Sequence, residues 1–164
     1  MQQHTDKNLS SSADQSFTKR FKDELKLANI FRESTSINEL LIGLKQEMRN
    51  YFNAEAFTIY FADNKNQQIV SMVKAGRLRK EIRLPLDKSS IAGYVATTGS
   101  IINIADAYDK PELKAIDPKL QFNRDWDDKS KFTTRQVLSA PVYYQKNLFG
   151  VVQLLNTRNG KRFT

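Results

Sequence analysis

Residues 90–108, SIAGYVATTGSIINIADAY, constrain the fold of this chain more than any other stretch. A serine can cap a helix start and a glycine can end a helix in the left-handed conformation, so Ser89 or Ser90 and Gly99 predict a short capped helix between them. A brief apolar strand over residues 101–104 and an irregular loop follow. Because so short a helix cannot bury its own apolar face, strands on both sides must supply a sheet beneath it. A helix and loop over a sheet can cover a small-molecule site.

The length of the chain, 164 residues, fits one domain, which would bury roughly 70% of its unfolded surface. The sequence contains no cysteine, which excludes disulfides, thiolate zinc sites, thiol nucleophiles and thioether-linked chromophores. Its net charge of +8 favours contact with anions but identifies no site. We expect a cytoplasmic protein without membrane insertion, because the N-terminus lacks the apolar core of a secretion signal and no run approaches the ~20 apolar residues of a membrane span.

The N-terminal third predicts helices. Residues 1–15 are polar and serine-rich and are expected to form a disordered tail. Residues 16–35 carry an apolar stripe at helical spacing, and this N-terminal helix either packs on a sheet or pairs with its own copy in a dimer. A second helix begins near Ser36, which forms a capping box with Glu39. Its apolar residues lie three or four apart: Ile37, Leu40, Leu41, Leu44, Met48 and Phe52.

Five further segments predict strands. Residues 54–62 are rich in aromatic and β-branched side chains, and the polar DNKNQQ after them predicts a hairpin turn into a strand over residues 69–75. A strand between Gly76 and Pro85 carries four cations, which either keep a solvated edge strand from aggregating or hold a phosphate. Residues 136–145 and 148–156 predict the last two strands. The final segment is almost continuously apolar, which is typical of a central strand.

Between these strands, residues 104–132 are rich in Asp, Pro and Asn and predict a long loop, which in compact domains is usually functional or mobile. Its acidic residues match no calcium-binding loop in their spacing; the ones considered are Asp106, Asp109, Asp125, Asp127 and Asp128. The one histidine, His4, lies in the N-terminal tail, so no general base accompanies them. We therefore expect neither a metal site nor a catalytic residue in this chain.

Three motifs resemble those of the GAF domain, a small-molecule sensing module, in the same order and at similar distances. They are IAGYVATTG leading into NIADAY, then FTTRQVLSAPV at residues 132–142 and FGVVQLLN at residues 149–156. The sequences of these motifs are most similar to those of the GAF domains of cyclic-nucleotide phosphodiesterases and adenylyl cyclases. The resemblance covers residues 36–164 and implies an α+β fold with a six-stranded antiparallel sheet. Terminal helices would cover one face, and a short helix with loops would cover a small-molecule pocket on the other, as in GAF and PAS domains.

By position, the resemblance implies a pocket lined from the first strand, the central helix, two loops and the last strand. The backbone N–H groups at the helix start would suit a phosphate, and the loop hydroxyls could donate hydrogen bonds. The implied ligand is a cyclic nucleotide, cAMP or cGMP. The implied residues are Thr58, Ile91, Ala92, Asp106, Ala107, Tyr108, Asp127, Ser130, Thr134 and Gln153.

The chain departs from the cyclic-nucleotide-binding members at three places, one of which is Gln153, which stands where an acid is often found. Lys74 and Ala75 stand where those members tend to carry an aromatic residue and an acid. The Asn-Lys…Phe-Asp-Glu signature of the family is present only as Asn156, Thr157 and Phe163, and the helix expected after it is cut short at the end of the chain.

Two functions therefore remain open. In the first, the domain binds a small-molecule effector and dimerises to control an output domain that is absent from this chain. In the second, it is a dimerisation or protein-interaction module of a larger signalling or secretion-type ATPase protein, and its pocket is filled by its own side chains, such as Tyr108, Phe122 and Trp126. Neither function involves nucleic acid, since the sequence contains no recognition-helix or single-strand-binding motif.

Overall fold

The computed structural model describes residues 18–164, except residues 27, 31, 36, 76 and 77. The chain divides into two compact units, Met1–Tyr51 and Phe52–Thr164. In the first unit, residues 18–26 are helical and α2 spans Ile37–Tyr51, which confirms both expected helices where they are described. The carboxylate of Glu39 accepts hydrogen bonds from the backbone N–H and the hydroxyl of Thr35, at 3.0 and 2.8 Å. The predicted tail and the predicted cap at Ser36 lie outside the described residues.

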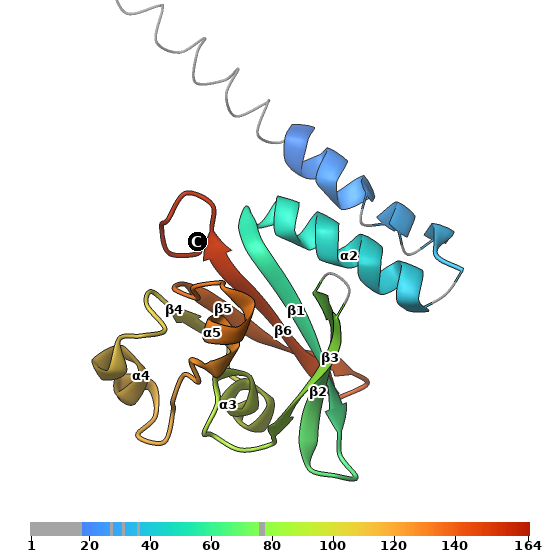
Figure 1. Ribbon diagram of the computed structural model, residues 1–164. Helices are drawn as coiled ribbons and strands as arrows, with labels where there is room; N and C mark the ends of the chain where they lie inside the picture. Colours follow the sequence, from blue (N-terminus) through green and yellow to red (C-terminus); the bar gives the residue numbers. More distant parts are fainter. Residues whose placement is uncertain (1–17, 27, 31, 36, 76–77) are drawn as a thin grey trace, which may run out of the picture. The chain divides into compact units, whose positions relative to one another are not determined.

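The second unit contains a six-stranded sheet in which every pairing is antiparallel, in the order β3-β2-β1-β6-β5-β4 (Figure 1). This confirms the α+β fold expected from the sequence. It also confirms the last strand as a central one and the cation-rich strand as an edge. The strands are β1 (Ala54–Asp63), β2 (Gln68–Ala75), β3 (Leu78–Pro85), β4 (Ile102–Ile104), β5 (Val137–Tyr144) and β6 (Asn147–Thr157).

Helix α3 (Ile91–Thr98) is capped as predicted. The hydroxyl of Ser90 accepts a hydrogen bond from the N–H of Gly93 at 3.0 Å. Gly99 adopts a φ of 71° and donates its N–H to the carbonyl of Val95. The absence of a side chain at Gly93 is required by packing, because a Cβ there would lie 2.5 Å from one backbone carbonyl oxygen and 2.8 Å from another. The helix packs on the sheet, and Val95 is fully buried in the core.

The prediction of a long loop over residues 104–132 is wrong, because two short helices interrupt it. Helix α4 (Lys110–Ile116) begins at Asp109, whose carboxylate accepts the N–H of Glu112, and it is anchored by the buried side chain of Leu113. Helix α5 (Asp125–Ser130) has three aspartates in its first turn. Their negative charges are stabilised there by the positive end of the helix dipole. Leu113 and Leu120 belong to the same buried core cluster as Val95 of α3, so this segment is a folded part of the second unit.

Candidate functional site

The sheet face beneath α3 carries several polar side chains at its centre. Thr58 on β1 lies directly opposite Gln153 on β6. Since side chains alternate along a strand, both share the face of Tyr60 and Val151, which pack in the core with α3. Ser139 is opposite Gln153, and Ser71 is opposite Tyr60, so they extend the same set. We call these residues the inner polar strip: Thr58, Tyr60, Ser71, Ser139 and Gln153.

Most of the inner polar strip is shielded from solvent. Gln153 is 7% exposed and Ser71 is 1% exposed. The hydroxyl oxygen of Ser71 has no hydrogen-bond partner among the described residues. Burial raises the pKa of the Tyr60 hydroxyl to about 12. A buried polar atom without a partner is uncommon in folded proteins and calls for a specific explanation, such as a bound molecule.

The two residues predicted at the start of α3, Ile91 and Ala92, have buried side chains that belong to the core. Only their backbone N–H groups could therefore face a ligand. Residues 117–121 run beside this helix end, and the N–H of Gln121 donates to the carbonyl of Ser89 at 3.0 Å.

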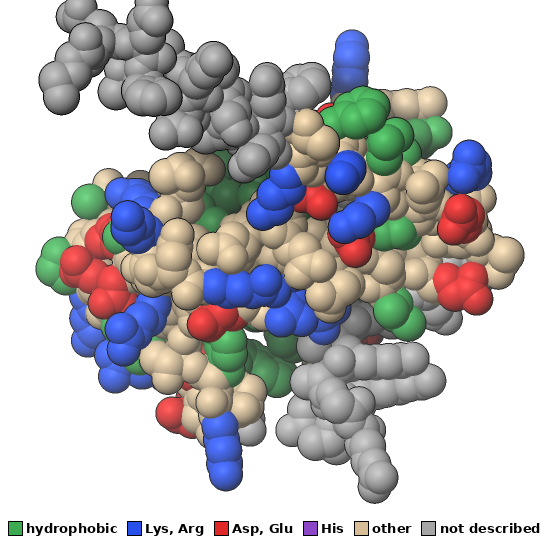
Figure 2. Space-filling model, turned by 90° about the horizontal axis from the view of Figure 1, so that it is seen from above, with side chains coloured by type: hydrophobic (Ala, Val, Ile, Leu, Met, Phe, Trp, Pro, Cys, Tyr) green, Lys and Arg blue, Asp and Glu red, His purple; other side chains and the backbone are tan. Residues whose placement is uncertain are grey.

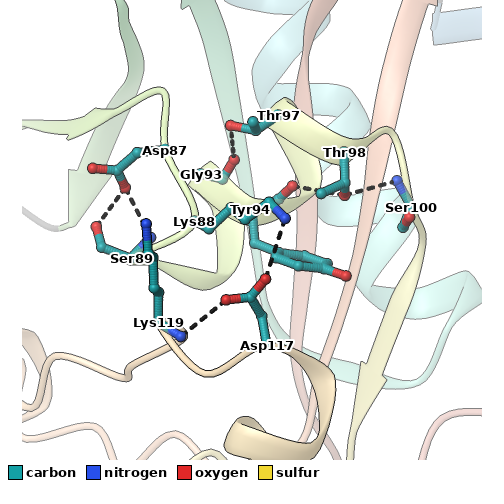
Figure 3. A network of polar contacts seen from close by, with 10 residues as sticks. All are labelled: Asp87, Lys88, Ser89, Gly93, Tyr94, Thr97, Thr98, Ser100, Asp117 and Lys119. Carbon is teal, nitrogen blue, oxygen red and sulfur yellow. Dashed lines mark hydrogen bonds and ion pairs between the residues drawn. The ribbon is translucent and has the colours of Figure 1, made fainter.

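A charged contact holds the same segment in place. The carboxylate of Asp117 lies between Lys88 and Lys119 (Figure 3). It accepts hydrogen bonds from the ammonium group of Lys88 at 3.2 Å and from the backbone N–H of Lys119 at 2.9 Å. These bonds lower the pKa of Asp117, with the Lys119 N–H as the largest cause.

Three of the predicted site residues, Tyr108, Asp127 and Thr134, are bonded to one another. Asp127 on α5 is 8% exposed, and its carboxylate accepts three hydrogen bonds. The donors are the Tyr108 hydroxyl at 2.8 Å, the Thr134 backbone N–H at 2.6 Å and the Thr134 hydroxyl at 2.8 Å. The bond to Asp127 raises the pKa of Tyr108. This Asp127 cluster joins the loop after β4, helix α5 and the loop before β5.

Aromatic and cationic groups complete the surroundings of Tyr108. Its ring lies 5.3 Å from that of Phe122, and the guanidinium carbon of Arg124 lies 4.4 Å from the centre of the Tyr108 ring. The ring of Tyr108 therefore has two protein partners, one aromatic and one cationic.

The remaining predicted residues bond to nearby backbone groups. Asp106 is exposed, and its carboxylate accepts the backbone N–H of Tyr108. Ala107 is buried, and its N–H donates to the carbonyl of Arg135. The hydroxyl of Ser130 donates to the carbonyl of Trp126 within its own helix at 2.6 Å.

Sequence reasoning missed the role of Asn156. Its side-chain carbonyl accepts the N–H of Arg135 at 2.7 Å, and its amide donates to the carbonyl of Thr133 and to the carboxylate of Glu55. Asn156 adopts a φ of 51°, which asparagine tolerates better than most residues. It therefore fixes the loop that carries Thr134. The incomplete family signature, which begins at this asparagine, was the available signal.

Other classes of site gain no support from the described residues. Among them, no group of three His, Asp or Glu side chains is arranged to hold a metal ion. No helix within the described ranges is long and apolar enough to cross a membrane. On the face seen in Figure 2, Lys and Arg side chains are interspersed with acidic and polar ones and do not form one continuous patch.

Among curated proteins, the chain is similar to cyclic-nucleotide phosphodiesterases. It is 29% identical over 144 residues to the "Probable 3',5'-cyclic phosphodiesterase pde-5" of Caenorhabditis elegans, covering 80% of this chain and 18% of that protein. It is 25% identical over 154 residues to the "Dual 3',5'-cyclic-AMP and -GMP phosphodiesterase 11A" of Takifugu rubripes, covering 82% of this chain and 16% of that protein. The chain thus spans less than a fifth of the length of either relative.

Solved structures share the fold at low sequence identity. The GAF domain of a phosphoenolpyruvate-protein phosphotransferase from Coxiella burnetii matches with a TM-score of 0.68 at 17% identity, covering 88% of this chain and 81% of that one. The A. aeolicus nlh2 GAF domain, in an inactive state, matches with a TM-score of 0.66 at 14% identity, covering 85% and 80%. The model of the GAF domain family itself matches residues 36–164. This chain therefore belongs to the GAF domain family.

Proposed function

We propose that this GAF domain is a cytoplasmic regulatory sensor that binds a small molecule between the sheet and the α3–α5 region and controls an attached output domain. The domain itself would carry no catalytic residue. Its similarity to short portions of much longer phosphodiesterases supports a role as one part of a larger protein. The same relatives make cAMP and cGMP the first ligands to test.

The observation that carries this proposal is the inner polar strip. A core that served only to stabilise the fold would gain by placing apolar residues there, because burying polar groups without partners costs free energy. The opposed pair Thr58 and Gln153 and the unpartnered hydroxyl of Ser71 instead offer hydrogen-bonding capacity beneath α3. A small molecule with polar edges would use that capacity.

The second candidate function is a dimerisation or protein-interaction module that binds no ligand. It is favoured by the Asp127 cluster, where predicted ligand-binding groups are already bonded to one another. In the helix at residues 18–26, Phe21 and Leu25 lie one turn apart and are about half exposed, at 52% and 48%. An exposed apolar stripe of this kind suits pairing with a second copy.

A thermal-shift series on the purified chain separates the two candidates. The series uses cAMP, cGMP, cyclic dinucleotides and AMP as the control nucleotide. A ligand present at a hundredfold excess over its dissociation constant stabilises the folded state by about 2.7 kcal/mol, which corresponds to a rise in melting temperature of roughly 5–10 °C for a domain of this size. A saturable rise with one ligand supports the sensor. No rise with any of them favours the interaction module.

A matched pair of variants tests where a stabilising ligand binds. Thr58→Val removes a hydroxyl from the inner polar strip, and Thr133→Val makes the same change at an exposed position. We expect the first variant to weaken binding and the second to leave it unchanged.

Light scattering of the unliganded chain and of the variant Leu25→Lys tests for a dimer. If the helix at residues 18–26 forms the interface, the dimer should dissociate in the variant.

A further inference from the structure

The segment that follows β6, residues 158–163, is fastened to the β4 end of the sheet. We call it the closing segment. The side-chain amide of Asn103 on β4 donates to the carbonyl of Phe163 at 2.7 Å, and the Arg162 guanidinium donates to the carbonyl of Asn103. The side chain of Phe163 is buried. The closing segment thus has a defined position next to the loop that begins where β4 ends.

Glu112 on α4 holds that loop from the other side. One carboxylate oxygen accepts the backbone N–H of Ala105 at 2.8 Å, and the other accepts that of Asp106 at 2.9 Å. The first of these oxygens also lies 3.6 Å from the Arg162 guanidinium. One carboxylate therefore touches both the start of the loop that leads to Tyr108 and the closing segment.

We infer that the Glu112–Arg162 pair couples the loop at residues 105–108 to the closing segment, so that a change in one shifts the conformation of the other. The inference rests on the proposed function in one respect, because the ligand of the proposed sensor is what would change the loop. Asp106 and Tyr108 are connected through the Asp106 carboxylate, and Tyr108 is bound to Asp127. A ligand that displaced Tyr108 would pull on the loop backbone, and Glu112 would then release its two N–H groups or Arg162.

The strength of this link suits a switch. The two side chains are 55% and 21% exposed, and ion pairs of such exposure alter an equilibrium by a factor of about two to five. A contact of that strength shifts the equilibrium between the bonded and released arrangements of the loop without making either one dominant. By thermodynamic reciprocity, the loop and the closing segment must affect each other equally.

Amide hydrogen exchange on the full chain tests the coupling without any ligand. We expect Arg162→Gln to accelerate exchange at the N–H groups of Ala105 and Asp106 by about two- to fivefold, because Glu112 loses its cationic partner. Lys161→Gln is the matched control, since it removes one positive charge from the same segment at an exposed side chain, and it should leave both amides unchanged. Exchange at the buried residue Val151 should not change in either variant.

A double-mutant cycle makes the test specific to the pair. Glu112→Gln should accelerate exchange at the backbone N–H groups of the closing segment. At those same N–H groups, the double variant with Arg162→Gln should show an acceleration smaller than the product of the two single effects. Unchanged exchange at Ala105 and Asp106 in Arg162→Gln would overturn the inference. So would a uniform acceleration that included Val151, because that pattern reports global destabilisation, and so would fully independent effects in the cycle. If the coupling is present but no ligand raises the melting temperature, only the proposed sensor function fails.

Discussion

Thr134→Val is the sharpest test of what the Asp127 cluster does. The substitution keeps the size and β-branching of a side chain that is 3% exposed and removes only its hydroxyl donor. The lost bond, 2.8 Å long, runs to a carboxylate, and hydrogen bonds to charged groups contribute about 1.5–3 kcal/mol. The added buried methyl group returns up to about 0.8 kcal/mol. We therefore expect a net loss of about 1–2 kcal/mol in the free energy of unfolding.

Urea denaturation followed by tryptophan fluorescence measures this loss. The sequence has one tryptophan, and it lies on α5 beside Asp127, so the signal reports on the unit that contains the cluster. Thr133→Val, at an exposed position, is the control and should change stability by less than about 0.5 kcal/mol. Equal midpoints for the two variants would refute a structural role for the Thr134 hydroxyl. If Thr134→Val instead left stability unchanged and abolished ligand binding, the hydroxyl would belong to the ligand site alone.

Three further predictions concern packing and titration. Gly93→Ala should cost roughly 1–3 kcal/mol or more, measured by thermal unfolding, because its Cβ would meet two backbone carbonyl oxygens. Gly160→Ala, whose Cβ would lie in open space, should be destabilised only by the strain of an alanine at a φ of 70°. Tyr60→Phe should remove a tyrosinate step near pH 12 from an ultraviolet titration. The raised pKa of Tyr60 means that its contribution to stability is complete below about pH 10 and is lost as the pH rises toward 12. Asp127→Asn should bring the pKa of Tyr108 back toward its ordinary value, which nuclear magnetic resonance of the ring can measure. An unchanged pKa would show that the hydrogen bond is not the main cause of the raised pKa.

Local patterns predicted most of the sheet. The aromatic and β-branched residues of β1 lie where pattern alone places them, and the hairpin turn after it forms at Asp63, which accepts bonds from Asn66. The Ser90 and Gly99 caps were predictable because each acts on atoms within a few residues of itself. The close approach at Gly93 was also predictable, since glycine inside a helix is costly unless packing requires it.

The site was less predictable, because its contacts join distant parts of the chain. Helix α4 did have a local signal, an aspartate three residues before a glutamate with a proline between them, but the surrounding Asp and Pro content obscured it. The residue that precedes helix α5, Arg124, makes no side-chain capping bond, and the helix has too few turns to show a periodic pattern. The bonds from Asn156 to Thr133 and from Tyr108 to Asp127 depend on tertiary structure that no spacing rule supplies.

The order of the strands also sets the order in which the domain can fold. The hairpins β1-β2, β2-β3 and β5-β6 are local in sequence, whereas β1 pairs with β6 across about a hundred residues, with Ala54 opposite Thr157. We therefore expect the centre of the sheet to close last, after a long loop has been formed at an entropic cost. We expect slow folding, with β1 left as an open strand edge until β6 has been synthesised, and a period during translation when that edge is the part of the chain most exposed to aggregation.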